Sequence, residues 1–135
     1  MILKKYEKNP ILQKNDANEW ESLCVLNPAV IYDDDKKFKM LYRAAGQDET
    51  HYIYLGLAES EDGFHFKRMS DRPAVSPTPD NYDSGCIEDP RLFKLGEWYY
   101  LTYASRAYAP GQYWKAGWKF LGDPPEFGPS FLKTN

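Results

Sequence analysis

The chain has 135 residues and a formal net charge of −3, from 17 basic and 20 acidic side chains. Its 42% hydrophobic and 27% charged residues are typical of one globular domain and exclude a disordered tail or a coiled coil. The mildly acidic balance excludes the basic face of a nucleic-acid binder, so we expect no nucleic-acid partner. Aromatic residues reach 16%, with 11 Tyr, and this favours β structure.

The start of the chain carries no sign of export. Its first residues lack the apolar core of a secretory signal, and no later run approaches the roughly 18 apolar residues that span a bilayer. We therefore expect no membrane partner and a cytoplasmic location. Cys24 and Cys86 have neither metal-site spacing nor the density of a disulfide framework, and His51 and His65 each stand alone in an alternating stretch.

Short alternating runs separated by turn residues predict a nearly all-β chain. No window longer than about ten residues keeps a helical period. In chain order, the predicted strands cover residues 29–32, 37–43, 51–59, 64–68, 91–94 and 98–105.

The sequence repeats itself at about 62 residues. The run 24–32, a turn and the run 38–44 have a second copy in 86–93, a shorter turn and 98–104. Pro28 matches Pro90 at an offset of 62, and Tyr42 matches Tyr103 at an offset of 61. Anchors in the same order at nearly one spacing indicate an internal duplication.

Each copy has room for about four strands, and the last two of the first copy join at an Asp62-Gly63 hairpin turn. Four-stranded units in tandem predict a β-propeller, with blades near 9–70 and 71–135 in a single domain; a duplicated two-sheet sandwich is the alternative. Equivalent positions of successive blades are arranged around the propeller axis rather than in contact. We therefore expect Cys24 and Cys86 not to pair.

The second copy gains charge where the first is mostly apolar. Glu88, Asp89 and Arg91 stand where the first copy has Leu26, Asn27 and Ala29. If this segment opens the innermost strand of each blade, the charges face the central funnel, where burial is costly unless they are paired or bind a ligand. The alternative is that Glu88 pairs with Arg91 while Asp89 caps a turn.

Two arginines and one loop are further candidates for ligand binding. Arg43 ends the matching strand of the first copy, and Arg106 lies near the end of its counterpart. Because guanidinium offers five fixed donors, the pair predicts recognition of a hydroxylated or anionic ligand. Most tyrosines fit blade packing, but the long Gly- and Pro-containing loop 107–114 carries aromatic rings that can stack on a sugar.

Several separated motifs together resemble one known family. They are Gly85-Cys86 ahead of the run 88–91 (Glu-Asp-Pro-Arg), Asn27-Pro28 leading to the strand 41–44, and the stretch 57–66. In this order they resemble the N-terminal part of glycoside hydrolase family 130, the β-mannoside phosphorylases and related β-mannosidases. The resemblance runs from about Asn9 to at least Tyr103.

The resemblance implies a five-bladed propeller with its active site in the central funnel. It implies that Asp89 donates a proton to the glycosidic oxygen, in the phosphorylases through a hydroxyl of the bound mannose. Asn27 and Arg43 fall on positions that resemble substrate-contacting residues, and Glu88 and Arg91 would hold Asp89 in place. The implied partners are an oligosaccharide with β-linked mannose and inorganic phosphate as co-substrate, with no metal and no other cofactor.

The chemistry of the residues agrees with this assignment. A phosphorylase needs one carboxylic acid and a basic phosphate pocket, whereas an inverting hydrolase needs a second carboxylate to activate water. Glu88 would raise the proton affinity of Asp89 and Arg91 would lower it, and both outcomes stay open. The basic candidates for the pocket are Lys94, Arg106, Lys115, Lys119 and Lys133.

We therefore expect inverting phosphorolysis of β-mannosides, releasing mannose 1-phosphate. The alternatives are β-mannosidase hydrolysis of β-1,2- or β-1,4-mannosides, a non-catalytic glycan-binding module, and another five-bladed clan active on arabinan or fructan. At about 62 residues per unit the chain would hold about two blades, whereas closed propellers have four to eight. We therefore expect a fragment that is inactive alone or completed by self-association.

Overall fold

The computed structural model describes residues 2–109, residue 111 and the backbone of residues 130–133. Within these ranges the chain forms strands and loops plus a single 3-10 turn, η1 (Glu19–Glu21). The described part contains no helix with the length and apolarity that a membrane crossing requires. The all-β fold class predicted from the sequence is confirmed. The strands are β1 (Cys24–Tyr32), β2 (Phe38–Ala45), β3 (Ile53–Ser60), β4 (Lys67–Arg68), β5 (Cys86–Leu95), β6 (Trp98–Arg106) and β7 (Ser130–Lys133).

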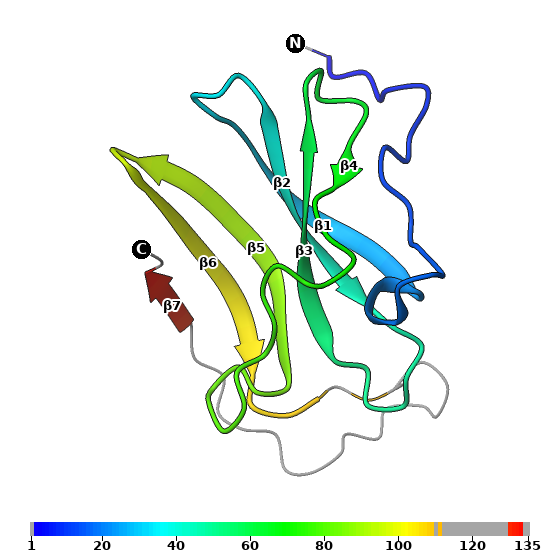
Figure 1. Cartoon of the computed structure of the whole chain (residues 1–135), viewed down its shortest axis with the longest axis vertical. Helices are drawn as coiled ribbons and strands as arrows, with labels where there is room; N and C mark the ends of the chain where they lie inside the picture. Colours follow the sequence, from blue (N-terminus) through cyan, green and yellow to red (C-terminus); the bar gives the residue numbers. More distant parts are fainter. Residues whose placement is uncertain (1, 110, 112–129, 134–135) are drawn as a thin grey trace.

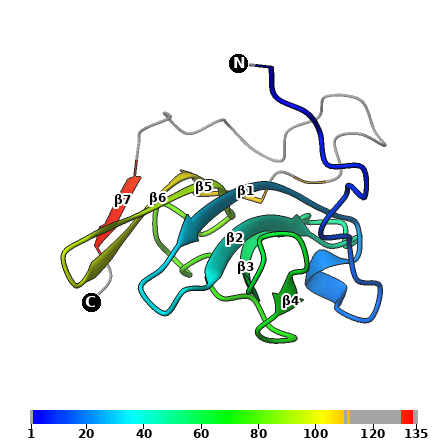
Figure 2. The same ribbon diagram turned by 90° about the horizontal axis from the view of Figure 1, so that it is seen from above.

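The strands form two antiparallel units. In the first, β1, β2 and β3 pair in chain order and the short β4 adds to β3; in the second, β5, β6 and β7 pair in chain order. One parallel residue pair, Ile53 with Cys86, joins the two units. Figure 1 shows the units diverging toward the top and converging where β3 and β5 begin, and Figure 2 shows them side by side from above.

The internal repeat is visible in the strand register. β1 and β2 lose register between Leu26 and Ala29, and β5 and β6 lose it between Glu88 and Arg91. Each break is a β-bulge at the same place in its unit, so the duplication extends to the backbone irregularity. The two cysteines are free thiols, as predicted.

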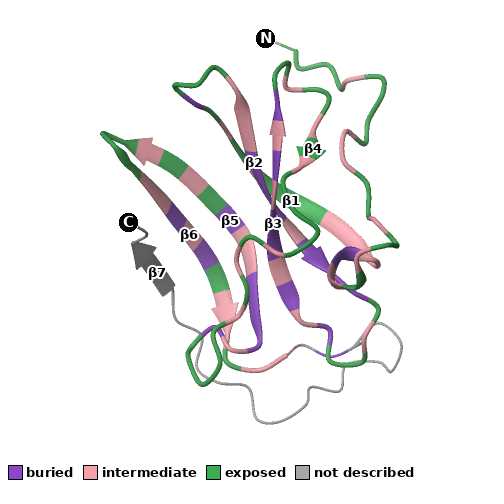
Figure 3. Ribbon diagram, in the orientation of Figure 1, coloured by how far each residue is buried: buried purple, intermediate pink, exposed green. Residues whose placement is uncertain are grey.

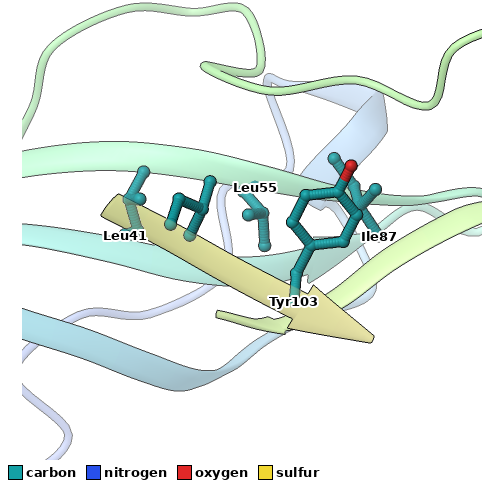
Figure 4. Packing of buried hydrophobic residues seen from close by; sticks show 5 residues of the cluster. Leu41, Leu55, Ile87 and Tyr103 are labelled. Carbon is teal, nitrogen blue, oxygen red and sulfur yellow. The ribbon is translucent and has the colours of Figure 1, made fainter. Parts of the chain in front are cut away.

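The hydrophobic core between the units comes from alternate positions of facing strands. Leu41 and Leu55 of the first unit pack with Ile87 and Tyr103 of the second (Figure 4). The opposite face of β2 buries Met40 and is covered by apolar residues of the N-terminal segment. Because both faces are covered, β2 and β3 have the largest share of buried residues among the strands whose burial is described (Figure 3).

One close approach in this second core requires glycine. Gly56 lies opposite Tyr42 in the register of β2 and β3. A Cβ at residue 56 would lie 2.2 Å from Cζ of the Tyr42 ring, which is closer than real carbon contacts. The missing side chain therefore makes the room that this fully buried ring occupies.

A buried ion pair anchors the N-terminal segment to the first unit. Glu21 is fully buried and accepts hydrogen bonds from Nε of Arg68 at 2.8 Å and from the Tyr42 hydroxyl at 3.1 Å. The Arg68 guanidinium also donates to the carbonyl of Gln13. Because the charges are paired and hydrogen-bonded, their burial is compensated.

A second polar cluster ties the two units together at the end of the strands remote from the bulges. Asp33, in the turn after β1, is almost fully buried. Its carboxylate accepts hydrogen bonds from Lys39 at 2.5 Å, from Lys94 at 2.9 Å and from the Tyr99 hydroxyl. Lys94 and Tyr99 belong to the second unit, so this carboxylate links the two units.

Two of the predicted strands begin later in the structure, and two begin earlier. The predicted strand 64–68 shrinks to β4 because the Asp62 carboxylate accepts hydrogen bonds from the backbone N–H of Phe64 and His65, which holds them in a turn. The predicted strand 51–59 begins at Ile53, because His51 has a left-handed backbone (φ 53°) and its N–H donates to Asp48. β1 and β5 begin earlier than predicted because they continue through their bulges.

Candidate active site

The two bulges present Asn27 and Asp89 in the same unusual backbone conformation. Their φ angles are 45° and 54°, in the left-handed region that Asn and Asp tolerate better than most residues. A proline follows each of them. Nδ2 of Asn27 donates a hydrogen bond to Oδ1 of Asp89 over 2.6 Å, so the bulges of the two units meet through their side chains.

Arg43 connects the first unit to two consecutive carboxylates of the second. It lies on β2 opposite Leu26, directly beside the bulge of β1. One terminal nitrogen donates to Oδ1 of Asp89 at 3.0 Å, and the other lies 2.7 Å from Oε2 of Glu88. The forked guanidinium therefore holds both carboxylates at once, which a lysine ammonium cannot do in the same geometry.

Glu88 is held between two guanidinium groups. Besides Arg43, Arg106 at the end of β6 contacts its other oxygen at 2.5 Å. Arg106 also donates through Nε to the sulfur of Cys86 at 3.2 Å. The side chain of Glu88 is 13% exposed and that of Asp89 is 41% exposed. Glu88 is therefore enclosed by its partners, while Asp89 remains open to a ligand.

Arg91 binds the backbone of the bulge and, among the described residues, no carboxylate side chain. Its guanidinium donates to the main-chain carbonyl of Asp89 at 3.0 Å. The alternative in which Glu88 and Arg91 pair is wrong, because the carboxylate of Glu88 is bound by Arg43 and Arg106.

The surroundings of Asp89 favour its ionised form. Partial burial works against ionisation, but the hydrogen bonds from Asn27 and Arg43 and the charges of Arg43 and Arg91 outweigh it, so the pKa of Asp89 lies below its usual value. The proton balance that the sequence left open between Glu88 and Arg91 is therefore decided mainly by Asn27 and Arg43. In the free site Asp89 is a carboxylate at neutral pH.

Two buried groups next to this cluster were not singled out by the sequence. His51 is buried with Nδ1 3.3 Å from the carbonyl oxygen of Gly46, and burial lowers its pKa, with smaller effects from the charges of Arg43 and Arg106. Burial also raises the pKa of the Cys86 thiol to about 11. Both groups are therefore neutral at neutral pH. No three metal-binding side chains of His, Cys, Asp or Glu come together in the described ranges.

Comparison with known proteins decides the family. The sequence model of glycoside hydrolase family 130, described as beta-1,4-mannooligosaccharide phosphorylase, matches residues 3–117. The match covers most of the chain. The chain belongs to glycoside hydrolase family 130.

Two curated relatives come from Thermoanaerobacter sp. (strain X514). A 1,2-beta-oligomannan phosphorylase is 38% identical over 106 residues, covering 75% of this chain and 35% of the relative. A beta-1,2-mannobiose phosphorylase is 34% identical over 112 residues, covering 75% of this chain and 36% of the relative. The chain thus spans about one third of the length of the curated relatives that it matches.

Solved structures agree with this family and with its propeller fold. A putative glycoside hydrolase from Parabacteroides distasonis ATCC 8503 superposes with a TM-score of 0.65 at 27% identity, covering 77% of this chain and 35% of the other. A second structure, with a TM-score of 0.64 and 28% identity, covers 76% of this chain and 33% of the other. Its description says that the GH130 family of mannoside phosphorylases contains glycoside hydrolases that target beta-1,2 mannosidic linkages in Candida mannan.

The family 130 site predicted from the sequence is largely assembled in one place. Asn27, Arg43 and Asp89 form one hydrogen-bonded group, and Glu88 joins it through Arg43. Arg106, which the sequence placed at a ligand, contacts Glu88. Register explains this outcome, because Arg106 pairs with Cys86 and so lies beside Glu88 on the neighbouring strand.

The basic residues proposed for a phosphate pocket are placed differently. Lys94 is bound to Asp33 and Asp34 at the opposite end of β5 from Asp89. Lys115, Lys119 and the side chain of Lys133 lie outside the described residues. Among the described residues outside the segment 88–91, Arg43 and Arg106 are the arginines that contact the carboxylates of the site.

Proposed function

We propose that the protein to which this chain belongs is an inverting β-mannoside phosphorylase, in which Asp89 is the proton donor and inorganic phosphate is the nucleophile. The observation that carries the proposal is the position of Asp89: a half-exposed carboxylate on a strained bulge, held by Asn27 and Arg43 in a family 130 chain. The products are mannose 1-phosphate and the shortened sugar.

The reaction follows from one acid and one external nucleophile. A phosphate oxygen attacks the anomeric carbon from the face opposite the leaving group, and the bond to the glycosidic oxygen breaks. The proton of Asp89 passes to that oxygen, through a hydroxyl of the bound mannose. The anomeric configuration inverts, and the proton that Asp89 gives up is taken back from solvent.

The proposal requires Asp89 to be protonated when substrate is bound. In the free site its carboxylate is ionised, because Asn27 and Arg43 donate to it. Bound sugar excludes water and competes for these donors, and a phosphate dianion adds negative charge nearby. All three changes raise the pKa of a carboxyl group, so binding of both substrates would load the acid.

The state of Glu88 favours phosphorolysis over hydrolysis. An inverting hydrolase needs a second carboxylate free to activate water. Glu88, which adjoins Asp89 in the chain, has its two oxygens engaged by Arg43 and Arg106 and is nearly enclosed. Hydrolysis of β-mannosides is the second candidate, because the structure 28% identical to this chain is described in terms of glycoside hydrolases.

The relatives narrow the proposed substrate. Both curated relatives are named for β-1,2-linked mannosides, whereas the family description names β-1,4-mannooligosaccharides. The two curated relatives are 38% and 34% identical to this chain, so their names are a better guide to the linkage than the family description. We therefore propose β-1,2-mannooligosaccharides as substrates. We also propose that the reaction uses no metal and no organic cofactor.

Substitution of Asp89 in the complete protein tests the proposal. Incubation with β-1,2-mannobiose, with and without phosphate, should release mannose 1-phosphate only when phosphate is present. Asp89→Asn should lower turnover by about 10²- to 10⁴-fold, because it removes the general acid with little change of shape. Asp71→Asn, at an exposed position before the second unit, is the matched control.

Each alternative gives a different result. Unchanged turnover by Asp89→Asn would show that Asp89 is not the proton donor. Release of free mannose at the same rate without phosphate would identify a hydrolase. Binding of the sugar without either product would identify a glycan-binding protein.

A further inference from the structure

A cavity lies at the same end of the strands as Asp89. It has a volume of about 530 Å³ and is bounded by residues at the start of β3, in the loop before β5 and just after β6. These strand ends meet at the bottom of Figure 1, and the neighbouring ends of β2 and β6 carry Arg43 and Arg106. The cavity shares no lining residue with the cluster around Asp89.

The lining of this cavity suits a sugar. Its lining residues include three tyrosines, Tyr52, Tyr54 and Tyr108, and two polar residues, Asp80 and Ser84. Pyranose rings present apolar C–H faces and hydroxyl edges, which match aromatic faces and polar tips respectively. The volume falls within the range of about 300–1,000 Å³ that is common for small-molecule sites.

Tyr108, which lines this cavity, carries an unsatisfied group. Its hydroxyl oxygen is buried and has no hydrogen-bond partner in the described structure. Buried polar groups almost always find a partner, so an orphan beside a cavity points to a ligand that supplies one. A sugar hydroxyl can both donate to and accept from a tyrosine hydroxyl.

The fold holds the walls of the cavity together. Gly85, in the loop before β5, packs tightly against the backbone of Tyr108. A Cβ at residue 85 would lie 1.8 Å from the carbonyl carbon of Tyr108. Ser84 Oγ donates to the carbonyl of Ala107 at 2.7 Å, and the N–H of Gly85 donates to the carbonyl of Arg106 at 2.9 Å. The position of Tyr108 is therefore set by backbone contacts to the start of β5.

We propose that this cavity is a distal sugar subsite, which takes a mannosyl unit of an oligomannoside away from the bond cleaved at Asp89. The inference rests on the proposed function, because it assigns the cavity to the same class of substrate. Both sugar units of a disaccharide bind at the cleavage site and leave none for the distal subsite. The subsite would therefore raise kcat/KM for longer chains relative to mannobiose.

The test compares chain lengths in the complete protein. Tyr108→Phe removes only the hydroxyl, which has no hydrogen-bond partner among the described residues, so the hydrogen bonds of the described fold are kept. We expect the ratio of kcat/KM for a β-1,2-mannohexaose to that for β-1,2-mannobiose to fall about 3- to 10-fold, the effect of one lost hydrogen bond. Tyr52→Ala should lower the ratio further. Tyr82→Ala, at an exposed tyrosine of the loop before β5 that does not line the cavity, is the control.

A binding measurement separates this proposal from the catalytic one. In the Asp89→Asn background, calorimetric titration with mannohexaose should give a 3- to 10-fold weaker affinity when Tyr108→Phe is added. This outcome would support the subsite even if no β-mannoside were cleaved. An equal ratio and an equal affinity in Tyr108→Phe and Tyr82→Ala would overturn the subsite while leaving the role of Asp89 untouched.

Discussion

Asn27 and Asp89 occupy the same position in the two copies of the repeat, and the amide of Asn27 donates to the carboxylate of Asp89 over 2.6 Å. The expectation that equivalent positions stay apart is wrong here. Both residues lie on bulges, with φ angles of 45° and 54°, and the bulges meet. Duplication has therefore placed an amide and a carboxylate in matching backbone frames, so that one copy supplies the acid and the other holds it.

Removal of the Asn27 side chain should raise the pKa of Asp89, because one of the hydrogen bonds that stabilise its ionised form is lost. Asn27→Gly is the suitable change, since glycine accepts the left-handed backbone without strain. NMR titration of the Asp89 carboxyl carbon measures the shift. Lys36→Gly, at another left-handed position (φ 60°) in the turn after β1, is the control and should leave this titration where it is.

Arg43→Lys should lower kcat/KM by about 10²-fold, although the charge is kept. The fork of Arg43 reaches Asp89 and Glu88 together, and a displacement of a catalytic group by about 1 Å is enough for such a loss. Steady-state kinetics with phosphate and a β-mannoside give the value. Arg72→Lys, on the exposed segment between the units, should retain wild-type kinetics. Full activity of Arg43→Lys would mean that charge alone matters at this position.

The part of the site that depends on the repeat could be predicted from sequence, whereas the part that depends on register could not. The offset of 62 singled out Asp89 because its counterpart is Asn27. The contact of Arg106 with Glu88 depends on the pairing of Cys86 with Arg106 across β5 and β6. A pattern of alternating residues does not specify that pairing, so the sequence did not predict the contact between Arg106 and Glu88.

Side-chain to backbone hydrogen bonds account for the errors in the strands. His51 continues an alternating pattern, but Asp48 captures its N–H and the strand begins two residues later. Asp62 does the same to Phe64 and His65. Local carboxylates compete with strand pairing for backbone donors, and alternation alone does not report this competition.

Arg106 is expected to act as a positioning residue for Asp89, through Glu88. Arg106→Gln would leave the charge of Glu88 balanced by Arg43 alone, and the extra negative charge would raise the pKa of Asp89. The alkaline limb of the pH profile of kcat, where the acid of the substrate-bound enzyme loses its proton, should therefore move to higher pH. Arg106→Lys should restore most of the wild-type limb. A purely structural role would lower stability or kcat and leave the limb in place.

Asp33 should make the stability of the protein depend on pH. Hydrogen bonds from Lys39, Tyr99 and Lys94 hold its pKa far below the usual range. A carboxyl group whose pKa is lower in the folded state contributes stability above its unfolded value of about 3.9, and loses it as the pH falls further. Asp33→Asn should therefore lower the unfolding midpoint at neutral pH, and the difference from wild type should narrow as the pH falls below about 4. Thermal unfolding of both proteins between neutral pH and pH values below about 4 measures this difference, with Asp71→Asn as the control. A difference that stays constant with pH would show that the contribution of Asp33 comes from its shape and not from its charge.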